Sequence, residues 1–236
     1  MTTTFTPIAA TRLPLAAPHS AEADRGASLG VVPALRRRMW QVVTAVSGGL
    51  TVTGRWQVSG GCVVVANHSS HADTAVLLAA LPSKARPVFA AAADYWFDDP
   101  MRRCIATSLA GVLPVARTGG NAYAGLLAAA RPALRAGRTV VIYPEGTRST
   151  DGQVGEFRSG AVQLARDCAV PIVPVAVSGT AAVLPKNGHY RRGAMQVRIG
   201  APVDPHRVSA TALRTRVLEL AGYPVPQPAF VTGGAA

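Results

Sequence analysis

Acidic residues, lysine and cysteine are all scarce in this chain. Among its 236 residues, 24 are basic and 12 are acidic, so the formal net charge is +12. Only Lys84 and Lys186 are lysines, and arginine carries nearly all of the positive charge. The charge favours anionic partners such as phospholipid headgroups, coenzyme A, an acidic carrier protein or nucleic acid, without choosing among them. A compositional bias of the source genome is an alternative account of part of the arginine excess.

The sequence also lacks disulfide and zinc patterns, long apolar runs and a signal peptide. Cys62, Cys104 and Cys168 lie far apart, are odd in number and lack metal-ligand spacing, so we predict buried thiols in a reducing compartment and no metal site. No apolar run approaches the length of a spanning helix, and residues 1–30 have neither a charged start nor a long apolar core. The chain therefore gives no clear sign of secretion or of membrane spanning.

The length and the spacing of apolar segments predict one domain with an irregular segment at each end. Residues 1–30 lack periodicity and residues 222–236 are rich in proline, so both are expected to be poorly ordered. The domain is predicted to span residues 31–221. Within it we expect strands at 62–66, 87–91, 111–116, 139–143, 172–177 and 195–199, and helices at 71–81, 97–110, 121–136, 158–168 and 209–221.

Two of the predicted strands are continuously apolar, which indicates a sheet that is buried on both faces. Residues 63–65 and 140–142 contain only valine and isoleucine and show no alternation with polar residues. We therefore expect an α/β fold, a single domain with a largely parallel sheet flanked by helices. Functional sites in such sheets gather at the carboxyl ends of the strands, and His68 and Glu145 both fall there.

The predicted strand at 172–177 contains a proline in an unfavourable place. Pro174 has no N–H to donate to a sheet ladder, which indicates an edge strand or a bulge at this point. The apolar residues of this strand fit either a core strand, which we favour, or the lining of a groove for an apolar chain.

A separate amphipathic segment precedes the first predicted strand. Apolar residues recur at helical spacing across 33–46, and three consecutive arginines stand near its start. Two interpretations are open: a helix lying in a membrane surface, within residues 31–48, or an ordinary helix packed on the sheet. Gly48 and Gly49 are expected to end the helix in either case.

A histidine and an aspartate follow the strand at 62–66. His68 and Asp73 would point roughly 140° apart on one continuous helix, so they can meet only if His68 lies in the turn and the helix begins after it. Ser70 and Asp73 form a suitable helix-start pair. Asp73 can then orient His68 as a general base, with a simple helix-start role for Asp73 as the alternative. His71 is a weaker candidate for the base, because it stands only two residues before Asp73.

A loop suited to phosphate follows the strand at 139–143. It contains Glu145, then Gly146, which lets backbone approach a ligand, and Arg148, whose planar fork suits phosphate oxygens. We include Thr147 among the candidate substrate-binding residues. While ionised, Glu145 cannot bind phosphate, and it is expected to hold the loop through backbone hydrogen bonds or to orient a substrate hydroxyl. The alternative is a plain turn with a surface Glu–Arg pair.

Arg117, after the predicted strand at 111–116, would bring a second guanidinium to the same edge of the sheet. A histidine base beside cationic groups favours acyl transfer to a phosphorylated alcohol as the leading hypothesis. The chain has no Gly-x-Ser-x-Gly elbow, which argues against a hydrolase, and no nucleic-acid signature. A non-catalytic basic protein that binds lipid remains an alternative.

Four segments, at 68–73, 111–117, 143–149 and 170–175, resemble in their order the blocks of the glycerolipid acyltransferase family. The best-known members of that family are the 1-acylglycerol-3-phosphate acyltransferases. The resemblance covers about residues 35 to 220, and its first and third blocks are the specific ones. Tyr143 stands where the family more often has phenylalanine, and no long amino-terminal anchor is evident. The segments are His68-x-x-x-x-Asp73, residues 111–117, residues 143–149 and residues 170–175, and 157–161 also resembles the segment after the third block.

The resemblance implies a fold, a reaction and a set of site residues. His68 would be the base, Asp73 would orient it, and Arg117, Glu145, Gly146 and Arg148 would shape the site for the acceptor. A fatty acyl group would pass from coenzyme A or acyl carrier protein to 1-acylglycerol-3-phosphate and give phosphatidic acid, with no cofactor. Backbone near Gly146 would bind the oxyanion. The enzyme would sit peripherally on the anionic, cytoplasmic face of the cell membrane and would not bind nucleic acid. Glycerol-3-phosphate, a lyso-aminolipid or a glycolipid are alternative acceptors.

Overall fold

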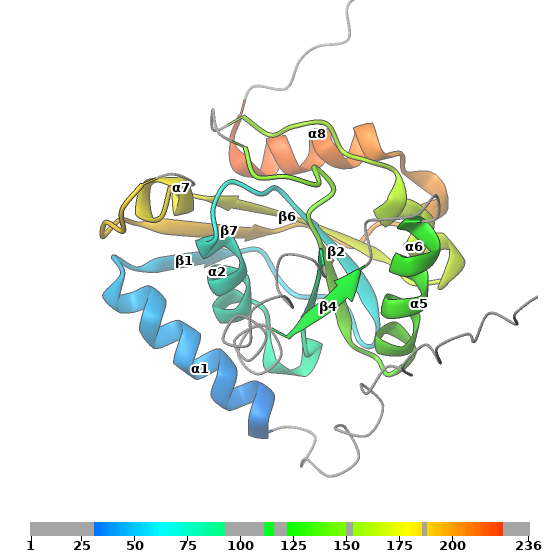
Figure 1. Cartoon of the computed structure of the whole chain (residues 1–236), viewed down its shortest axis with the longest axis horizontal. Coiled ribbons are helices and arrows are strands. Elements are labelled where there is room, and N and C mark those ends of the chain that lie inside the picture. Colours follow the sequence, from blue (N-terminus) through cyan, green and yellow to red (C-terminus); the bar gives the residue numbers. More distant parts are fainter. Residues whose placement is uncertain (1–30, 93–110, 116–121, 150–152, 186–187, 224–236) are drawn as a thin grey trace, which may run out of the picture.

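A seven-stranded sheet lies at the centre of the computed structural model, which describes residues 31–92, 111–115, 122–149, 153–185 and 188–223 (Figure 1). The strand order is β1-β7-β6-β2-β5-β3-β4, and only β6 and β7 are antiparallel neighbours. The predicted, largely parallel sheet is thus confirmed. The strands are β1 (Leu50–Thr53), β2 (Cys62–Ala66), β3 (Val88–Ala92), β4 (Val112–Val115), β5 (Thr139–Ile142), β6 (Ile172–Ser178) and β7 (Met195–Ile199).

Helices cover both faces of the sheet. Val64 belongs to a buried cluster with residues of α2, whereas Val63 belongs to a second cluster with residues of α5, α6 and α8. Neighbouring residues of β2 therefore face opposite layers, which explains why the strand is apolar throughout. The helices are α1 (Val31–Val46), α2 (Ala72–Ala80), α5 (Ala122–Arg135), α6 (Gly160–Asp167), α7 (Thr180–Val183) and α8 (Ala210–Ala221), with 3-10 turns at Ser83–Ala85 and Pro205–Arg207.

Most of the predicted elements are present, with ends that differ by one or two residues. β1 and the short helix α7 were not predicted, because neither has enough residues to show a period. The predicted helix at 97–110 and the predicted irregular segment at 1–30 lie outside the described residues. Of the segment 222–236, only two residues are described, and they close α8: Gly222 has φ +78° and its N–H donates to Glu219 O.

Pro174 lies in a central strand, so the edge-strand alternative is wrong. β6 stands between β7 and β2, and its residues are buried, which confirms the interpretation as a core strand. The bulge alternative is correct. Ile172 lies opposite Val203 and Val175 opposite Ile199, so the partner segment has one residue more than β6. The N–H of Gly200 still donates to Pro174 O at 2.9 Å, so the bond that Pro174 cannot donate is the one lost from the ladder, next to the extra residue.

The cysteine thiols match the prediction in part. Cys62 is fully buried, and burial raises the pKa of its thiol to about 11, although a contact with the Thr139 hydroxyl at 3.4 Å opposes the rise. Cys168 is only half-buried. Both are free thiols, and Cys104 lies outside the described residues.

Candidate active site

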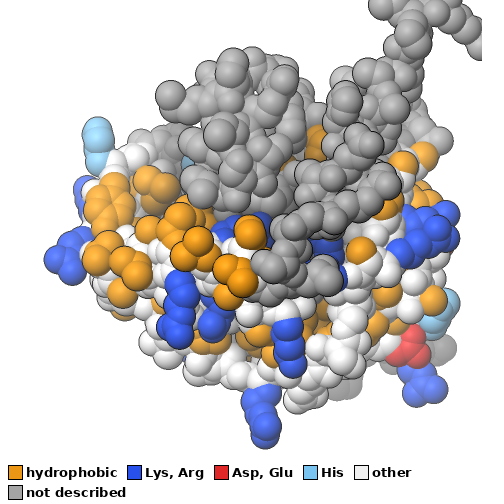
Figure 2. Space-filling model, turned by 90° about the horizontal axis from the view of Figure 1, so that it is seen from below, with side chains coloured by type: hydrophobic (Ala, Val, Ile, Leu, Met, Phe, Trp, Pro, Cys, Tyr) orange, Lys and Arg blue, Asp and Glu red, His pale blue; other side chains and the backbone are white. Residues whose placement is uncertain are grey.

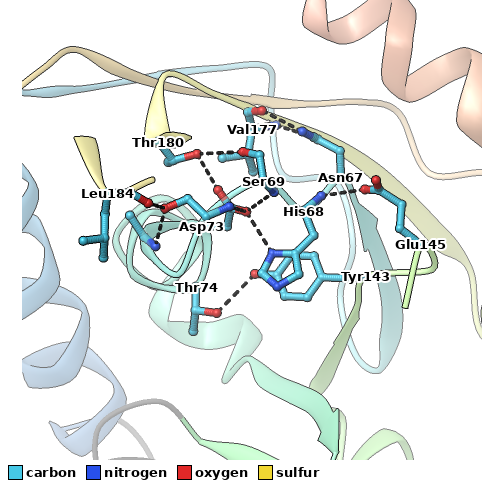
Figure 3. Close-up of polar contacts among 12 residues, drawn as sticks. Asn67, His68, Ser69, Asp73, Thr74, Tyr143, Glu145, Val177, Thr180 and Leu184 are labelled. Carbon is cyan, nitrogen blue, oxygen red and sulfur yellow. Dashed lines mark hydrogen bonds and ion pairs between the residues drawn. The ribbon is translucent and has the colours of Figure 1, made fainter. Parts of the chain in front are cut away.

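The predicted site residues meet because two neighbouring strands end at the same edge of the sheet. β2 and β5 are parallel, with Val65 beside Ile142, so His68 and Glu145 leave the sheet side by side (Figure 3). Two backbone contacts join the loops: the N–H of His68 donates to Glu145 Oε1 at 2.7 Å, and the N–H of Ser149 donates to His68 O at 2.9 Å. The loop after β5 therefore helps to hold His68 in place.

His68 and Asp73 form the predicted pair. The Nδ1 of His68 lies 2.9 Å from Asp73 Oδ2, and α2 begins at Ala72, so Asp73 is in the first turn of the helix. The Asp73 side chain is 0% exposed, whereas the imidazole is 18% exposed and can reach a ligand. When Nδ1 carries the hydrogen and donates a hydrogen bond to Asp73, Nε2 is left as the basic nitrogen. The geometry expected from the spacing is confirmed, and the catalytic role remains a prediction.

Three further groups donate hydrogen bonds to the buried carboxylate of Asp73. The N–H groups of Ser69 and Ser70 reach Oδ2 at 2.7 Å and 2.8 Å, and the Thr180 hydroxyl donates to Oδ1. The predicted helix-start pair of Ser70 and Asp73 is in contact through the Ser70 N–H, while the Ser70 hydroxyl accepts from the N–H of Ala72 at 3.0 Å. A buried carboxylate is tolerated only when it is paired and hydrogen-bonded in this way.

Tyr143 supports the imidazole from one side. Its ring stacks on His68 with centroids 4.0 Å apart and an angle of 11° between the planes, an arrangement that favours the ring once it is protonated. The Tyr143 hydroxyl lies 3.3 Å from Thr74 Oγ1. Burial raises the pKa of Tyr143 well above its usual value, and the nearby charge of Asp73 adds to the rise. Phenylalanine at this position would keep the stacking and lose only the contact with Thr74.

Glu145 holds the loop after β5 in place through hydrogen bonds from two backbone N–H groups. Besides the N–H of His68, it accepts the N–H of Gly155 on its second oxygen at 2.9 Å. Burial raises the pKa of Glu145, and these two backbone donors oppose the rise. Because each carboxylate oxygen is held by a backbone donor, the first of the two predicted roles, loop support, is the one that the structure shows.

A hollow of about 490 Å³ opens beside Glu145 and is lined by Thr147, Arg148 and Arg158. Among the described residues, Arg148 Nη1 is buried without a hydrogen-bond partner. An anionic ligand bound at this hollow would supply a hydrogen-bond acceptor for the Arg148 guanidinium. A smaller hollow of about 60 Å³ lies against His68, and Glu145 lines both hollows.

Gly146 has a conformational and a steric reason to be glycine. Its φ is +73°, and a Cβ there would lie 3.2 Å from the Arg158 guanidinium carbon. The N–H of Gly146 donates to Tyr143 O at 3.1 Å, so this amide does not supply the expected oxyanion donor. The expectation of an oxyanion donor in the backbone near Gly146 therefore stays a prediction for the neighbouring N–H groups.

Two predicted residues, Arg117 and His71, are not among the contacts described above. Arg117 lies outside the described residues, so its expected place at this edge stays a prediction. His71 is exposed at the amino end of α2, while it is His68 that contacts Asp73. Sequence reasoning gave no role to Arg158, although it lies in the segment 157–161, and it missed Thr180 entirely because no local pattern connects that residue with Asp73.

An α/β sheet with a histidine–aspartate pair at a strand end, beside a hollow lined by arginine, is an arrangement suited to an enzyme that moves a proton next to an anionic ligand. Residues 34–178 match the sequence model for the Acyltransferase family, and the chain belongs to this family. The match ends at the last residue of β6 and thus includes His68, Asp73, Glu145 and Arg148.

Similar proteins share one named activity. The chain is 31% identical over 148 residues to the chloroplastic 1-acyl-sn-glycerol-3-phosphate acyltransferase BAT2 of Brassica napus, covering 60% of this chain and 40% of that protein. It is 33% identical over 161 residues to 1-acyl-sn-glycerol-3-phosphate acyltransferase alpha of Homo sapiens, covering 65% and 56%. The chain therefore spans about half or less of these relatives' length.

A solved structure supports the fold over a larger part of the chain. The crystal structure of the 1-acyl-sn-glycerophosphate acyltransferase PlsC from Thermotoga maritima aligns with a TM-score of 0.64 and 27% identity. The alignment covers 79% of this chain and 75% of the Thermotoga chain. The single α/β domain predicted from the sequence thus has a counterpart among known acyltransferases.

Proposed function

We propose that this protein transfers a fatty acyl group from a thioester of coenzyme A or acyl carrier protein to the free hydroxyl of 1-acylglycerol-3-phosphate, which gives phosphatidic acid. The names of the relatives and of the Thermotoga structure support this acceptor. The observation that carries the proposal is the hollow lined by Arg148, whose guanidinium has a nitrogen without a hydrogen-bond partner, and which shares Glu145 with the hollow at His68. This arrangement places the Arg148 guanidinium, which can bind a phosphate, near His68, which can act as the base for a hydroxyl.

The proposed reaction needs one base and one good leaving group. Nε2 of His68 takes the proton from the acceptor hydroxyl while the oxygen attacks the thioester carbonyl carbon. Asp73 accepts the hydrogen bond from Nδ1 and stabilises the positive charge on the ring. The tetrahedral intermediate then collapses, the C–S bond breaks, and the thiolate takes the proton from Nε2. Since a thiolate leaves readily, the proposal requires no metal and no cofactor.

A thioester-release assay over a small panel of acceptors tests the function. Purified protein is mixed with an acyl thioester of CoA or of acyl carrier protein and with lysophosphatidate, glycerol-3-phosphate, a lyso-aminolipid or a glycolipid, and the free thiol is measured. We expect release to be fastest with lysophosphatidate. Faster release with another acceptor would move the assignment to that acceptor, and no release with any acceptor, from CoA or carrier protein, would overturn the proposal.

Arg148→Ala is expected to weaken the use of phosphorylated acceptors. The loss of a charge-assisted contact corresponds to a rise in KM of roughly 10- to 100-fold for lysophosphatidate. An unphosphorylated acceptor should be affected much less. The matched control is Arg207→Ala, which removes one charge from a side chain that is 88% exposed and pairs with Asp204. An equal loss for both kinds of acceptor would remove Arg148 from its assigned role.

The apolar face of α1 is the part of the proposed enzyme that would meet the membrane. α1 packs against α2 through its Trp40 and Gln41 side, and the Gln41 side-chain amide lies 3.4 Å from Ala79 O. At 100° per residue, the exposed apolar residues fall within about 120° of one face. The packed side of α1 is thus observed in the structure, and we propose that the opposite, exposed side lies in a membrane surface. The exposed residues are Val31, Val32, Leu35, Val42, Val43 and Val46.

Charge around this face agrees with an anionic lipid surface as the partner. Figure 2 shows the apolar side chains gathered together with basic side chains at their border. Such a face fits the peripheral location that we propose, on the cytoplasmic leaflet, where soluble thioester donors are supplied and where free thiols persist. Among the described residues, no helix is long and apolar enough to cross a bilayer.

Leu35→Glu combined with Val42→Glu is expected to reduce vesicle binding at least tenfold. These side chains are 69% and 63% exposed, so the change removes apolar area available to lipid without disturbing the core. Co-sedimentation with vesicles of phosphatidylglycerol and phosphatidylcholine measures the effect. The control places the same two charges at the exposed Thr211 and Ala212 of α8, on the other face of the sheet. Equal binding by both variants would leave α1 as a packing helix only.

A further inference from the structure

We infer that Thr180 is a positioning residue that holds the Asp73 carboxylate against His68. This inference rests on the proposed role of His68 as the base. Thr180 stands at the start of α7, 107 residues after Asp73, and both side chains are 0% exposed. No feature near Asp73 in the sequence indicates this contact, and Thr180 lies beyond the end of the family match at residue 178.

Thr180 donates the hydrogen bond to one oxygen of the Asp73 carboxylate, and the other described donors reach the second oxygen. The Oδ2 atom of Asp73 accepts from His68 Nδ1 and from two backbone N–H groups, all within the segment 68–73. The Oδ1 atom accepts from the Thr180 hydroxyl. With one oxygen anchored from outside the segment, the carboxylate cannot rotate about its Cβ–Cγ bond without losing a hydrogen bond. Its plane is therefore fixed, and Oδ2 stays directed at the imidazole.

The backbone before Thr180 is built to bring its hydroxyl to this position. Gly179 has φ +83°, and a Cβ at this residue would lie 2.2 Å from Ala194 O, so both conformation and space require glycine. The chain thereby turns sharply out of β6 into α7. Figure 3 shows the Thr180 hydroxyl pointing at Asp73 from the end of β6, on the side away from His68.

A second set of contacts fixes α7 to the histidine segment. The Ser70 hydroxyl donates to Leu184 O at 2.6 Å, and the Ser69 hydroxyl lies 3.3 Å from Thr180 Oγ1. The N–H of Leu184 in turn donates to Thr180 O at 2.8 Å. Thr180 therefore belongs to a closed network between α7 and the turn that carries His68, and its hydroxyl is held in the donating orientation toward Asp73.

Replacement by valine and by serine separates this role from simple packing. Thr180→Val keeps the shape and removes the hydroxyl, and we expect kcat to fall roughly 10- to 100-fold with KM for the acceptor within about twofold. Thr180→Ser keeps the hydroxyl and should recover most of the activity. The matched control is Thr139→Val, since Thr139 is also 0% exposed and its hydroxyl contacts Cys62 away from the site. That control should lose stability and keep kcat.

A spectroscopic readout makes the test independent of the substrate. In protein labelled with ¹⁵N-histidine, the proton on His68 Nδ1 should give a downfield signal, assigned by its loss in a His68→Gln variant. Thr180→Val should shift or broaden this signal, and Thr180→Ser and Thr139→Val should leave it in place. An unchanged signal in Thr180→Val, or a kcat above half of wild type, would overturn the inference. A wild-type protein that shows the signal but transfers no acyl group would overturn only the proposed function.

Discussion

His68→Ala is expected to reduce acyl transfer by about 100- to 10,000-fold, the range that positioned proton transfer contributes. The imidazole that Asp73 orients is lost, and His71 does not replace it, because that side chain is exposed at the start of α2. Both kcat and kcat/KM should fall by the same factor, since the base acts in the transition state. Thiol release from an acyl-CoA in the presence of lysophosphatidate measures the loss.

The fold should survive this replacement. Asp73 keeps three of its four donors, from Ser69, Ser70 and Thr180, so the carboxylate remains satisfied without His68. The melting temperature should therefore change by only a few degrees. His71→Ala is the control, and its activity should stay close to that of wild type. Should His68→Ala keep most of its activity while His71→Ala loses it, the base would have been assigned to the wrong histidine.

The contact between His68 and Asp73 was predictable because the information is local. The two positions are five apart, so they cannot meet on one continuous helix and can meet only if the helix begins after His68. The meeting of Glu145 with His68 also followed from the sequence, since two buried parallel strands end at one edge. Both predictions used regular geometry, which a pattern of apolar residues is enough to specify.

Other features of the site depend on contacts that no periodic pattern specifies. Thr180 reaches Asp73 because Gly179 turns the chain after β6, and α7 has only four residues. The bulge that accommodates Pro174 depends on a segment after β7 that shows no strand pattern. Similarly, the N–H of Gly146 is used within its own turn, which sequence reasoning could not weigh against an oxyanion role. These are tertiary consequences of particular loops.

The proposed substrates follow from the resemblance to known acyltransferases, whereas the proposed type of reaction follows from the site residues. The spacing of His68 and Asp73 and the guanidinium of Arg148 indicate proton transfer beside an anion, and many acceptors satisfy that description. The choice of 1-acylglycerol-3-phosphate rests on the names of relatives, of which this chain covers a limited part. For this reason the acceptor panel, rather than a single assay, is the decisive measurement of function.

Asp73→Asn is expected to keep the fold and to reduce kcat by roughly 100- to 10,000-fold. The amide oxygen can take the place of Oδ2 and accept from His68, Ser69 and Ser70. The amide nitrogen then takes the place of Oδ1 and donates to Thr180, whose hydroxyl can accept as well as donate. The hydrogen bonds are thus preserved while the negative charge that stabilises protonated His68 is lost.

Asp73→Ala provides the contrast, because it leaves two backbone N–H groups in the turn without an acceptor and should lower stability as well as activity. A melting curve of each variant separates loss of charge from loss of structure. The double variant Asp73→Asn with Thr180→Val completes the test. If Thr180 acts through the charge of Asp73, its removal should cost less kcat in the Asp73→Asn background than in wild type, so the two effects will not add. Additive losses would mean that Thr180 affects the reaction by another route, and an Asp73→Asn variant with more than a tenth of wild-type kcat would show that the charge is dispensable.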